Sequence, residues 1–205
     1  YNGPVMFEGG AVATILANNL LNRGGLIATR SLGPTRGGLA DQFGQRIIDS
    51  RLTVKNYTAK KEYNGTPLYG YYEVDGEGVT PEAEMTLVDK GVFGKMLNGR
   101  IPTKNALETT GSSRFMMIPQ SPTVATGTGT IHVQVDKGIS HEKMKKALIK
   151  AAKEAGQSCA YIVRGISGVT LEVYRVDLKD GRETRVRATS FRLPDLTKLL
   201  KFVAI

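Results

Sequence analysis

Few side chains in this chain of 205 residues could carry out covalent or metal chemistry. The chain contains two histidines, His132 and His141, and a single cysteine, Cys159. A catalytic thiol needs a nearby base to form its thiolate, and no paired arrangement of cysteine and histidine is visible in the sequence. We therefore interpret Cys159 as a buried, unreactive thiol, in keeping with a reducing, cytoplasmic compartment.

Two carboxylates, Asp75 and Glu77, stand close together in the segment Asp-Gly-Glu-Gly. Such a pair could bind a metal ion or act as acid and base. Aspartate and glycine also stabilise tight turns through local hydrogen bonds, and the sequence favours this second interpretation. An enzyme with another mechanism, using Asp75, Glu77, His132 or Cys159, is the least favoured of three hypotheses.

The loop Thr110-Gly111-Ser112-Ser113-Arg114 has a composition typical of a binding loop. Small residues leave backbone N–H groups accessible, and a guanidinium adds a bidentate donor. The loop is the best candidate for a binding feature, in which Gly111, Ser112, Ser113 and Arg114, with Arg100, would contact the backbone or a carboxylate of a bound peptide. The sequence favours the other interpretation, a purely structural loop beneath a sheet.

The opening of the chain predicts a strand-like lead-in followed by a helix. Pro4 favours an extended conformation over residues 1–7, and apolar residues then recur at helical spacing over residues 8–21. The helix ends in Ala17-Asn18-Asn19-Leu20-Leu21-Asn22, which contains amides and alkyl groups and no titratable side chain.

The lead-in Gly3-Pro4-Val5-Met6-Phe7-Glu8-Gly9 resembles the opening of the catalytic half of the TldD/PmbA family, also called modulators of DNA gyrase. In catalytic members an HExxxH zinc motif follows at this distance. The resemblance aligns its two histidines with Ala17 and Asn22, and its general-base glutamate with Asn18. Alanine offers zinc no ligand, a neutral amide is a poor one, and Asn18 cannot accept a proton. We expect no catalytic residue and no metal in this chain, and zinc only in a catalytic paralogue.

Other segments resemble the family in the same order along the chain. "Leu-Val-Asp-Lys-Gly-Val-Phe" at residues 87–93 is similar to a family hairpin, and residues 110–114 are similar to its "T-G-N-G-R" loop. The resemblance implies an α+β fold of mostly antiparallel and mixed β-sheet with a few packed helices. It also implies that residues 1–205 form one C-terminal-type domain, without the family's N-terminal domain.

Local signals predict the remaining elements. Ser140 and Gly156 bracket a helix over residues 140–155, and Asp89-Lys90-Gly91 predicts a hairpin with a three-residue loop. A second hairpin pairs residues 171–176 with 184–191. The other expectations are β-structure over 68–75, 123–135 and 159–163, an extended connector over 116–122, and a helix over 195–202.

The composition is that of an ordinary globular protein, with 40% hydrophobic and 23% charged residues. No apolar run approaches the roughly 20 residues needed to cross a bilayer, and we expect no membrane association. The net charge of +9 makes nucleic acid a possible partner. The densest basic group, which we interpret as a solvated helix face, consists of Lys143, Lys145, Lys146, Lys150 and Lys153.

These observations lead to one main functional expectation. The chain is a non-catalytic family member, or a fragment of one, that assembles with a zinc-bearing paralogue, or with itself as a dimer. In that assembly it helps to bind extended peptide for proteolysis or maturation. The alternative is a basic module that binds nucleic acid or gyrase.

Overall fold

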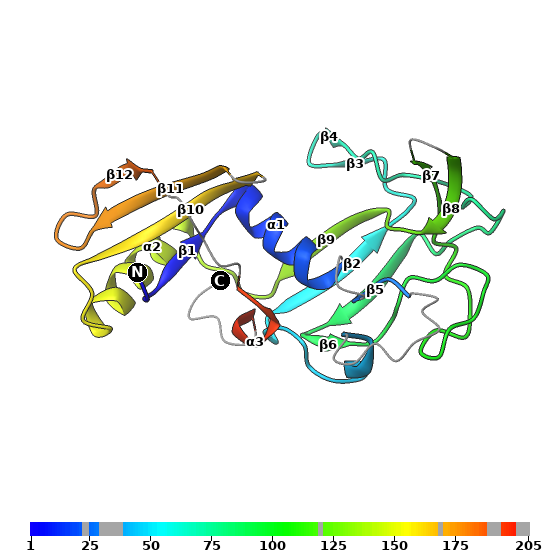
Figure 1. Cartoon of the computed structure of the whole chain (residues 1–205), viewed down its shortest axis with the longest axis horizontal. Helices are drawn as coiled ribbons and strands as arrows, with labels where there is room; N and C mark the ends of the chain where they lie inside the picture. Colours follow the sequence, from blue (N-terminus) through cyan, green and yellow to red (C-terminus); the bar gives the residue numbers. More distant parts are fainter. Residues whose placement is uncertain (22–24, 29–38, 119–120, 168–169, 188–193, 200–205) are drawn as a thin grey trace. The chain divides into compact units, whose positions relative to one another are not determined.

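The structure is a computed structural model and describes residues 1–21, 25–28, 39–118, 121–167, 170–187 and 194–199. It combines α-helices with antiparallel and mixed β-sheets, which confirms the predicted α+β class (Figure 1). The chain divides into two compact units: unit 1 comprises Tyr1–Asn18 and Lys137–Ile205, and unit 2 comprises Asn19–Asp136. That residues 1–205 act as one family-type domain stays a prediction.

Unit 1 contains a four-stranded sheet with the order β1-β10-β11-β12. Its strands are β1 (Val5–Phe7), β10 (Cys159–Ser167), β11 (Thr170–Asp177) and β12 (Glu183–Val186). β1 runs parallel to β10, with Val5 opposite Tyr161, and the other neighbours are antiparallel. The predicted lead-in strand and second hairpin are confirmed, the latter as far as Val186; residues 188–191 lie outside the described residues.

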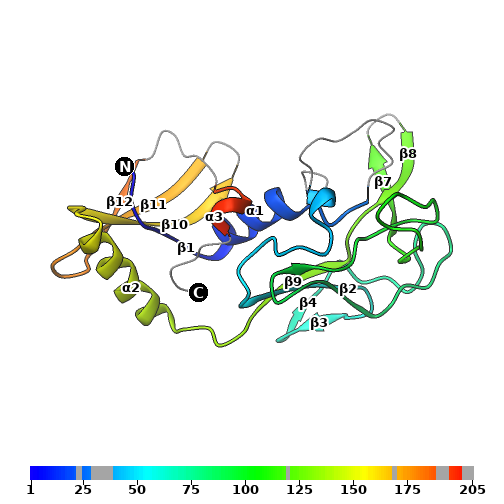
Figure 2. The same ribbon diagram turned by 90° about the horizontal axis from the view of Figure 1, so that it is seen from below.

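The helix α2 (His141–Glu154) packs against β1 and β10 (Figure 2). The Ser140 hydroxyl accepts a hydrogen bond from the Lys143 N–H at 3.5 Å, and Gly156 follows the helix with a φ of +66°. Both signals are local, which explains why the predicted bounds are nearly correct. One hydrophobic core of unit 1 includes residues of α2 and of the sheet. Its buried residues are Met6, Leu148, Ala152, Ala160, Ile162, Val176 and Leu178.

The helix α1 (Gly9–Leu20) begins over the opposite face of the same sheet. Ala11 packs there with Val163 and with Val173, the residue opposite Val163 on β11. Val163 follows Ile162, and successive strand residues alternate, so this pair faces away from α2. α1 is regular through Leu20, so the predicted helix is confirmed. The division between the two units falls inside it, after Asn18.

Unit 2 contains an antiparallel sheet with the order β6-β5-β2-β9. Its strands are β2 (Leu52–Tyr57), β5 (Glu84–Asp89), β6 (Val92–Phe93) and β9 (Thr130–Val135). The β5–β6 hairpin is confirmed, but the three-residue loop is wrong because Asp89 pairs with Val92 within the ladder. The loop is therefore Lys90-Gly91, with φ values of 44° and 82°, as a type I′ turn requires.

A separate hairpin replaces the connector predicted over residues 116–122. β7 (Ser113–Ile118) pairs with β8 (Ser121–Thr126), and Pro122 lies opposite Met117. Within the described residues β8 has no second neighbouring strand, so a proline there breaks no ladder hydrogen bond. Pro122 therefore marks an edge strand, and Pro119 lies outside the described residues.

The β-structure predicted over residues 68–75 is wrong. Gly70 lies so close to Gly129 and Thr130 that an added Cβ would come within 2.5 Å of their backbone. The Tyr72 N–H donates to the Thr58 carbonyl just beyond the end of β2. These close contacts hold the segment in an irregular conformation despite its β-forming tyrosines.

The short elements complete the description: η1 (Leu39–Gln42), β3 (Glu62–Tyr63), β4 (Thr66–Pro67) and α3 (Leu196–Leu199). The helix predicted over residues 195–202 is thus confirmed in part, and residues 200–202 lie outside the described residues. Among the described residues, no helix combines the length and the apolar character that crossing a membrane requires.

The turn at Gly91 gives a test of this fold. An added Cβ would lie 2.5 Å from the Ile48 carbonyl oxygen, at a φ that favours glycine. We predict that Gly91→Ala lowers the free energy of unfolding by at least about 2 kcal/mol, measured by urea denaturation. Gly94→Ala, with no heavy atom within 4 Å of the new Cβ, is the control and should change it by less than about 0.5 kcal/mol. Equal effects would contradict the turn described here.

Candidate functional site

A buried carboxylate, Asp75, holds together several loops of unit 2. Its Oδ1 accepts hydrogen bonds from the Glu77 and Val79 N–H groups, both at 2.9 Å, and its Oδ2 accepts from the Ser113 N–H at 3.0 Å. Two of the three donors are local, which confirms the turn interpretation of Asp75. Because three N–H groups surround a residue that is only 7% exposed, this carboxylate is a structural acceptor.

The second carboxylate, Glu77, joins two further segments to the turn. Its Oε2 accepts hydrogen bonds from the Arg100 N–H at 2.8 Å and from the Ser113 hydroxyl at 2.5 Å. Both Asp75 and Glu77 therefore bind the first residue of β7. The arrangement fixes the loop before β7 and the segment at Arg100, and leaves Asp75 engaged in structure rather than poised as an acid or base.

A buried amide and two hydroxyls extend this cluster. The Asn98 N–H donates to the Thr110 Oγ1 at 2.7 Å, and Thr110 Oγ1 lies 2.9 Å from the Ser112 hydroxyl. The Asn98 Nδ2 donates to the carbonyls of Ala106 and Glu108. We call this hydrogen-bonded set the Asp75 cluster: Asp75, Glu77, Asn98, Thr110, Ser112 and Ser113.

The predicted peptide-binding residues all lie at this cluster, but their backbone donors are occupied. The Gly111 N–H donates to the Thr109 hydroxyl, the Ser112 N–H to the Asn98 carbonyl, and the Ser113 N–H to Asp75. Ser112 and Ser113 are also buried. Peptide binding at these positions stays a prediction, and its donors would have to come from the side chains of Arg100 and Arg114.

Arg114 stacks on a tyrosine that the sequence analysis did not single out. Its guanidinium carbon lies 4.0 Å from the centre of the Tyr72 ring, and the Tyr72 hydroxyl donates to the Gly111 carbonyl at 2.9 Å. Burial raises the pKa of Tyr72 above its ordinary value. The ring therefore acts as a neutral platform that holds the half-buried guanidinium in place.

The strand that carries Arg114 also exposes apolar side chains. Phe115 is 63% exposed and Val124, directly opposite on β8, is 38% exposed. Arg114 and Phe115 are successive strand residues, so they point to opposite faces of the hairpin. Among the described residues, β7 and β8 pair only with each other. The Gly76 N–H donates to the Ser113 carbonyl at the start of β7, and beyond that residue the hairpin presents polar and apolar contacts beside strand edges that no other described strand covers.

The two histidines lie in different units and contact different partners. In unit 1, the His141 Nε2 lies 2.6 Å from the Glu8 Oε1. In unit 2, His132 packs edge-on against Tyr57 and Tyr63, with ring centres 5.5 and 4.8 Å apart. The described residues include no group of three or more His, Cys, Asp or Glu side chains that could hold a metal ion. Cys159 is buried in β10.

An ion-pair network in unit 1 connects residues that are remote in sequence. Arg164 lies 2.9 Å from the Glu8 Oε2 through Nε and 2.6 Å from the Glu183 Oε2 through Nη2. Lys145 lies 2.6 Å from the Glu183 Oε1. The Lys145 ammonium, followed by Arg164, holds the pKa of Glu183 below its ordinary value. No local sequence signal indicates this network, because its members come from separate elements of the sheet and α2.

Comparison with known proteins identifies the family of this chain. Residues 2–165 match the family described as "PmbA/TldA metallopeptidase C-terminal domain", a match that runs through both units. The chain belongs to the TldD/PmbA family. It corresponds to the C-terminal part of family members, as the sequence predicted. We found no match among curated proteins.

Two solved structures of TldD/PmbA type are similar to this chain. TldE from Thermococcus kodakarensis matches with a TM-score of 0.57 and 16% identity, over 88% of this chain and 39% of that one. A "putative modulator of DNA gyrase" from Bacteroides thetaiotaomicron matches with a TM-score of 0.47 and 16% identity, over 89% of this chain and 36% of that one. The first likeness supports the fold, and this chain spans well under half of either relative.

The zinc motif of catalytic TldD/PmbA members does not fit the residues present here. Ala17 and Asn18 lie half-buried in the regular part of α1, and Asn22 lies outside the described residues. A methyl group and two carboxamides offer neither an imidazole nor a carboxylate to zinc. The i, i+5 spacing of the two histidine positions also places them on different sides of an undistorted helix. We therefore derive no chemical step through a zinc ion bound to α1.

The Asp75 cluster predicts a structural rather than a catalytic defect. Asp75→Asn replaces one carboxylate oxygen by an NH₂ group that cannot accept from the surrounding N–H groups. We expect the free energy of unfolding to fall by about 2–3 kcal/mol in urea denaturation. Asp136→Asn, at an exposed position of the same unit, is the control and should cost less than about 0.5 kcal/mol. A wild-type stability for Asp75→Asn would refute the structural role.

The ion-pair network predicts a pH dependence. The folded-state pKa of Glu183 lies below the unfolded value of about 4.5, so its contribution is present above that pH and is lost as the pH falls through the folded-state pKa. We predict that Glu183→Gln makes the loss of stability below about pH 4.5 shallower, measured by urea denaturation at several pH values. Glu154→Gln, at an exposed position, should leave the pH profile unchanged. Identical profiles for wild type and Glu183→Gln would contradict the network.

Proposed function

We propose that this chain is a non-catalytic TldD/PmbA-type protein, or part of one, that assembles with a zinc-bearing paralogue and helps it to bind peptide. The observation that carries the proposal is the residue set Ala17, Asn18 and Asn22 at the zinc-motif positions. A subunit without zinc ligands and without a general base cannot activate water as catalytic TldD/PmbA members would. Its contribution to proteolysis or maturation would then be binding and positioning.

The β7–β8 hairpin is the part of unit 2 best suited to an extended peptide. A peptide that pairs with an open strand edge gains main-chain hydrogen bonds, which tolerate many sequences. Phe115, with its exposed ring, offers an apolar contact for a side chain of that peptide. This combination supports binding of unfolded segments with little sequence selectivity.

The guanidinium groups of Arg114 and Arg100 supply the polar part of the proposed surface. Arg114 is held by Tyr72, so less side-chain freedom is lost when it binds a carbonyl or carboxylate. The Arg100 backbone is fixed by Glu77 while its residue is exposed. The Asp75 cluster thereby serves as the support that keeps both arginines beside β7.

Mixing the chain with a paralogue that carries an intact HExxxH motif tests the proposal. We expect a stable complex in size-exclusion chromatography with light scattering, and faster cleavage of an unstructured peptide than by the paralogue alone. Arg114→Gln with Phe115→Ser should raise KM for that peptide about fivefold and leave kcat nearly unchanged, because it removes binding that is equal in the ground state and the transition state. The matched control, Arg46→Gln with Leu107→Ser, changes the same residue types at exposed positions of unit 2 and should leave KM unchanged.

Two results would overturn the proposal. One is zinc at one ion per chain in metal analysis of the isolated protein, together with peptide hydrolysis in the absence of a paralogue. The other is no complex and no change in cleavage rate when the paralogue is present. A complex with unchanged KM for the double variant would retain the assembly and reject β7 as the peptide surface.

A further inference from the structure

The positive charge of the chain is concentrated in unit 1. This unit contains 15 of the 28 Lys and Arg residues and 8 of the 19 Asp and Glu residues, which gives it a net charge of +7. Unit 2 contains the remainder and has a net charge of +2. The sequence shows the total of +9 and a dense group of lysines over residues 143–153. The division into units shows that most of the excess belongs to the part that contains α2.

Within unit 1, α2 carries a continuous stripe of exposed lysines. We call Lys143, Lys146, Lys150 and Lys153 the lysine stripe; all four are exposed. At 3.6 residues per turn they fall within an arc of about 80°, and they extend over about 15 Å of the helix. Lys145 is separate from the stripe, because it turns to Glu183 in the ion-pair network.

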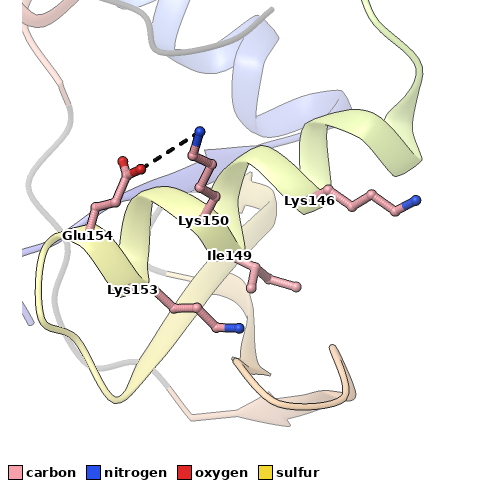
Figure 3. Close-up of a pocket in the computed structure, with 5 residues that line it drawn as sticks. All are labelled: Lys146, Ile149, Lys150, Lys153 and Glu154. Carbon is pink, nitrogen blue, oxygen red and sulfur yellow. Dashed lines mark ion pairs between the residues drawn. The ribbon is translucent and has the colours of Figure 1, made fainter.

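The lysine stripe borders a shallow, open hollow of about 380 Å³. Its lining residues are Lys146, Ile149, Lys150, Lys153 and Glu154 (Figure 3). Figure 3 shows Lys146, Ile149 and Lys153 directed to one side of α2, and Lys150 directed toward Glu154 on the other. The loop between β11 and β12 also reaches this helix, since a Cβ added at Gly181 would lie 3.6 Å from the Ile149 Cδ1.

The charges of the lysine stripe are largely uncompensated within the described part of the chain. The ion pair found there joins Lys150 to Glu154 at 3.8 Å, with side chains that are 78% and 66% exposed. Such an exposed i, i+4 pair contributes only a few tenths of a kcal/mol to stability. Another anion can therefore replace Glu154 beside Lys150 at little cost. The four ammonium groups along this part of α2 therefore remain accessible to an external partner.

From this geometry we infer that the lysine stripe of α2 is a docking surface for the phosphate backbone of a nucleic-acid duplex. A duplex carries about one negative charge per 1.7 Å of its axis, so a 15 Å row of ammonium groups meets several phosphates at once. Lysines contact phosphates as point charges, without sequence selectivity. The inference concerns unit 1 and does not depend on a partner subunit or on peptide binding.

Three other occupants fit the surface less well: a membrane, a protein partner and a single-stranded nucleic acid. A membrane-binding helix places large apolar residues beside its lysines, whereas the apolar residue lining this hollow is the half-buried Ile149. Protein interfaces favour aromatic residues and arginine and are depleted in lysine, and the stripe contains lysine alone. A single strand would bind by stacking on aromatic rings, and the stripe offers none.

The experiment measures fluorescence anisotropy of a labelled DNA duplex of random sequence with the whole chain, over a series of salt concentrations. Four phosphate contacts predict a slope of log affinity against log salt of about −3.6. Replacing Lys143, Lys146, Lys150 and Lys153 together by Gln should weaken binding at least tenfold at about 0.1 M salt and reduce that slope by about 3.6. Glutamine keeps a high helix propensity, so α2 should remain folded, which circular dichroism checks.

A charge-matched variant distinguishes the stripe from net charge. Replacing Lys60, Lys61, Lys90 and Lys104 of unit 2 by Gln removes the same charge and should change the duplex affinity less than about twofold. Equal losses for the two variants, or no duplex binding by the wild type at about 0.05 M salt, would overturn the inference. Tighter binding to phosphatidylserine vesicles or to polyglutamate than to the duplex would also overturn it, because the occupant would then be a membrane or an acidic protein.

Discussion

The local structure of unit 2 depends on one buried charge. Asp75 is 7% exposed, and a carboxylate removed from water in this way is costly unless several donors surround it. The three N–H groups that bind it come from its own turn and from β7, 38 residues later. Its burial therefore requires the turn and the start of β7 to form together. Glu77 extends the same requirement to the segment of Arg100, so that an otherwise irregular region takes up one conformation.

The sequence predicts those elements whose signals are local. The bounds of α2 follow from Ser140 and Gly156, and the β5–β6 hairpin follows from Lys90-Gly91, because caps and turns are decided within a few residues. The β7–β8 hairpin escaped prediction because Pro122 hides an edge strand. The segment at Gly70 escaped it because its conformation is set by contact with Gly129, which no local pattern encodes.

The same distinction between local signals and long-range contacts applies to the candidate site. Residue type alone identifies the missing zinc ligands, since Ala17 and Asn18 lack donor chemistry in any conformation. What surrounds the predicted binding loop could not be predicted from its composition. Ser113 looks accessible by residue type, but its N–H and hydroxyl are both taken by carboxylates from elsewhere in the chain. The stacking of Arg114 on Tyr72 also depends on three-dimensional proximity across 42 positions.

The parallel pairing of β1 with β10 has a consequence for biosynthesis. Val5 lies opposite Tyr161, and all of unit 2 is translated between these two strands. At about 5–20 residues per second, a ribosome needs roughly 8–30 s to make that intervening stretch. During this time Met6 in β1 lacks its partner strand β10. The contacts within unit 2, by contrast, require only residues 19–136. Unit 2 can thus fold while the chain is still growing, and unit 1 closes only when β10 emerges to complete its sheet.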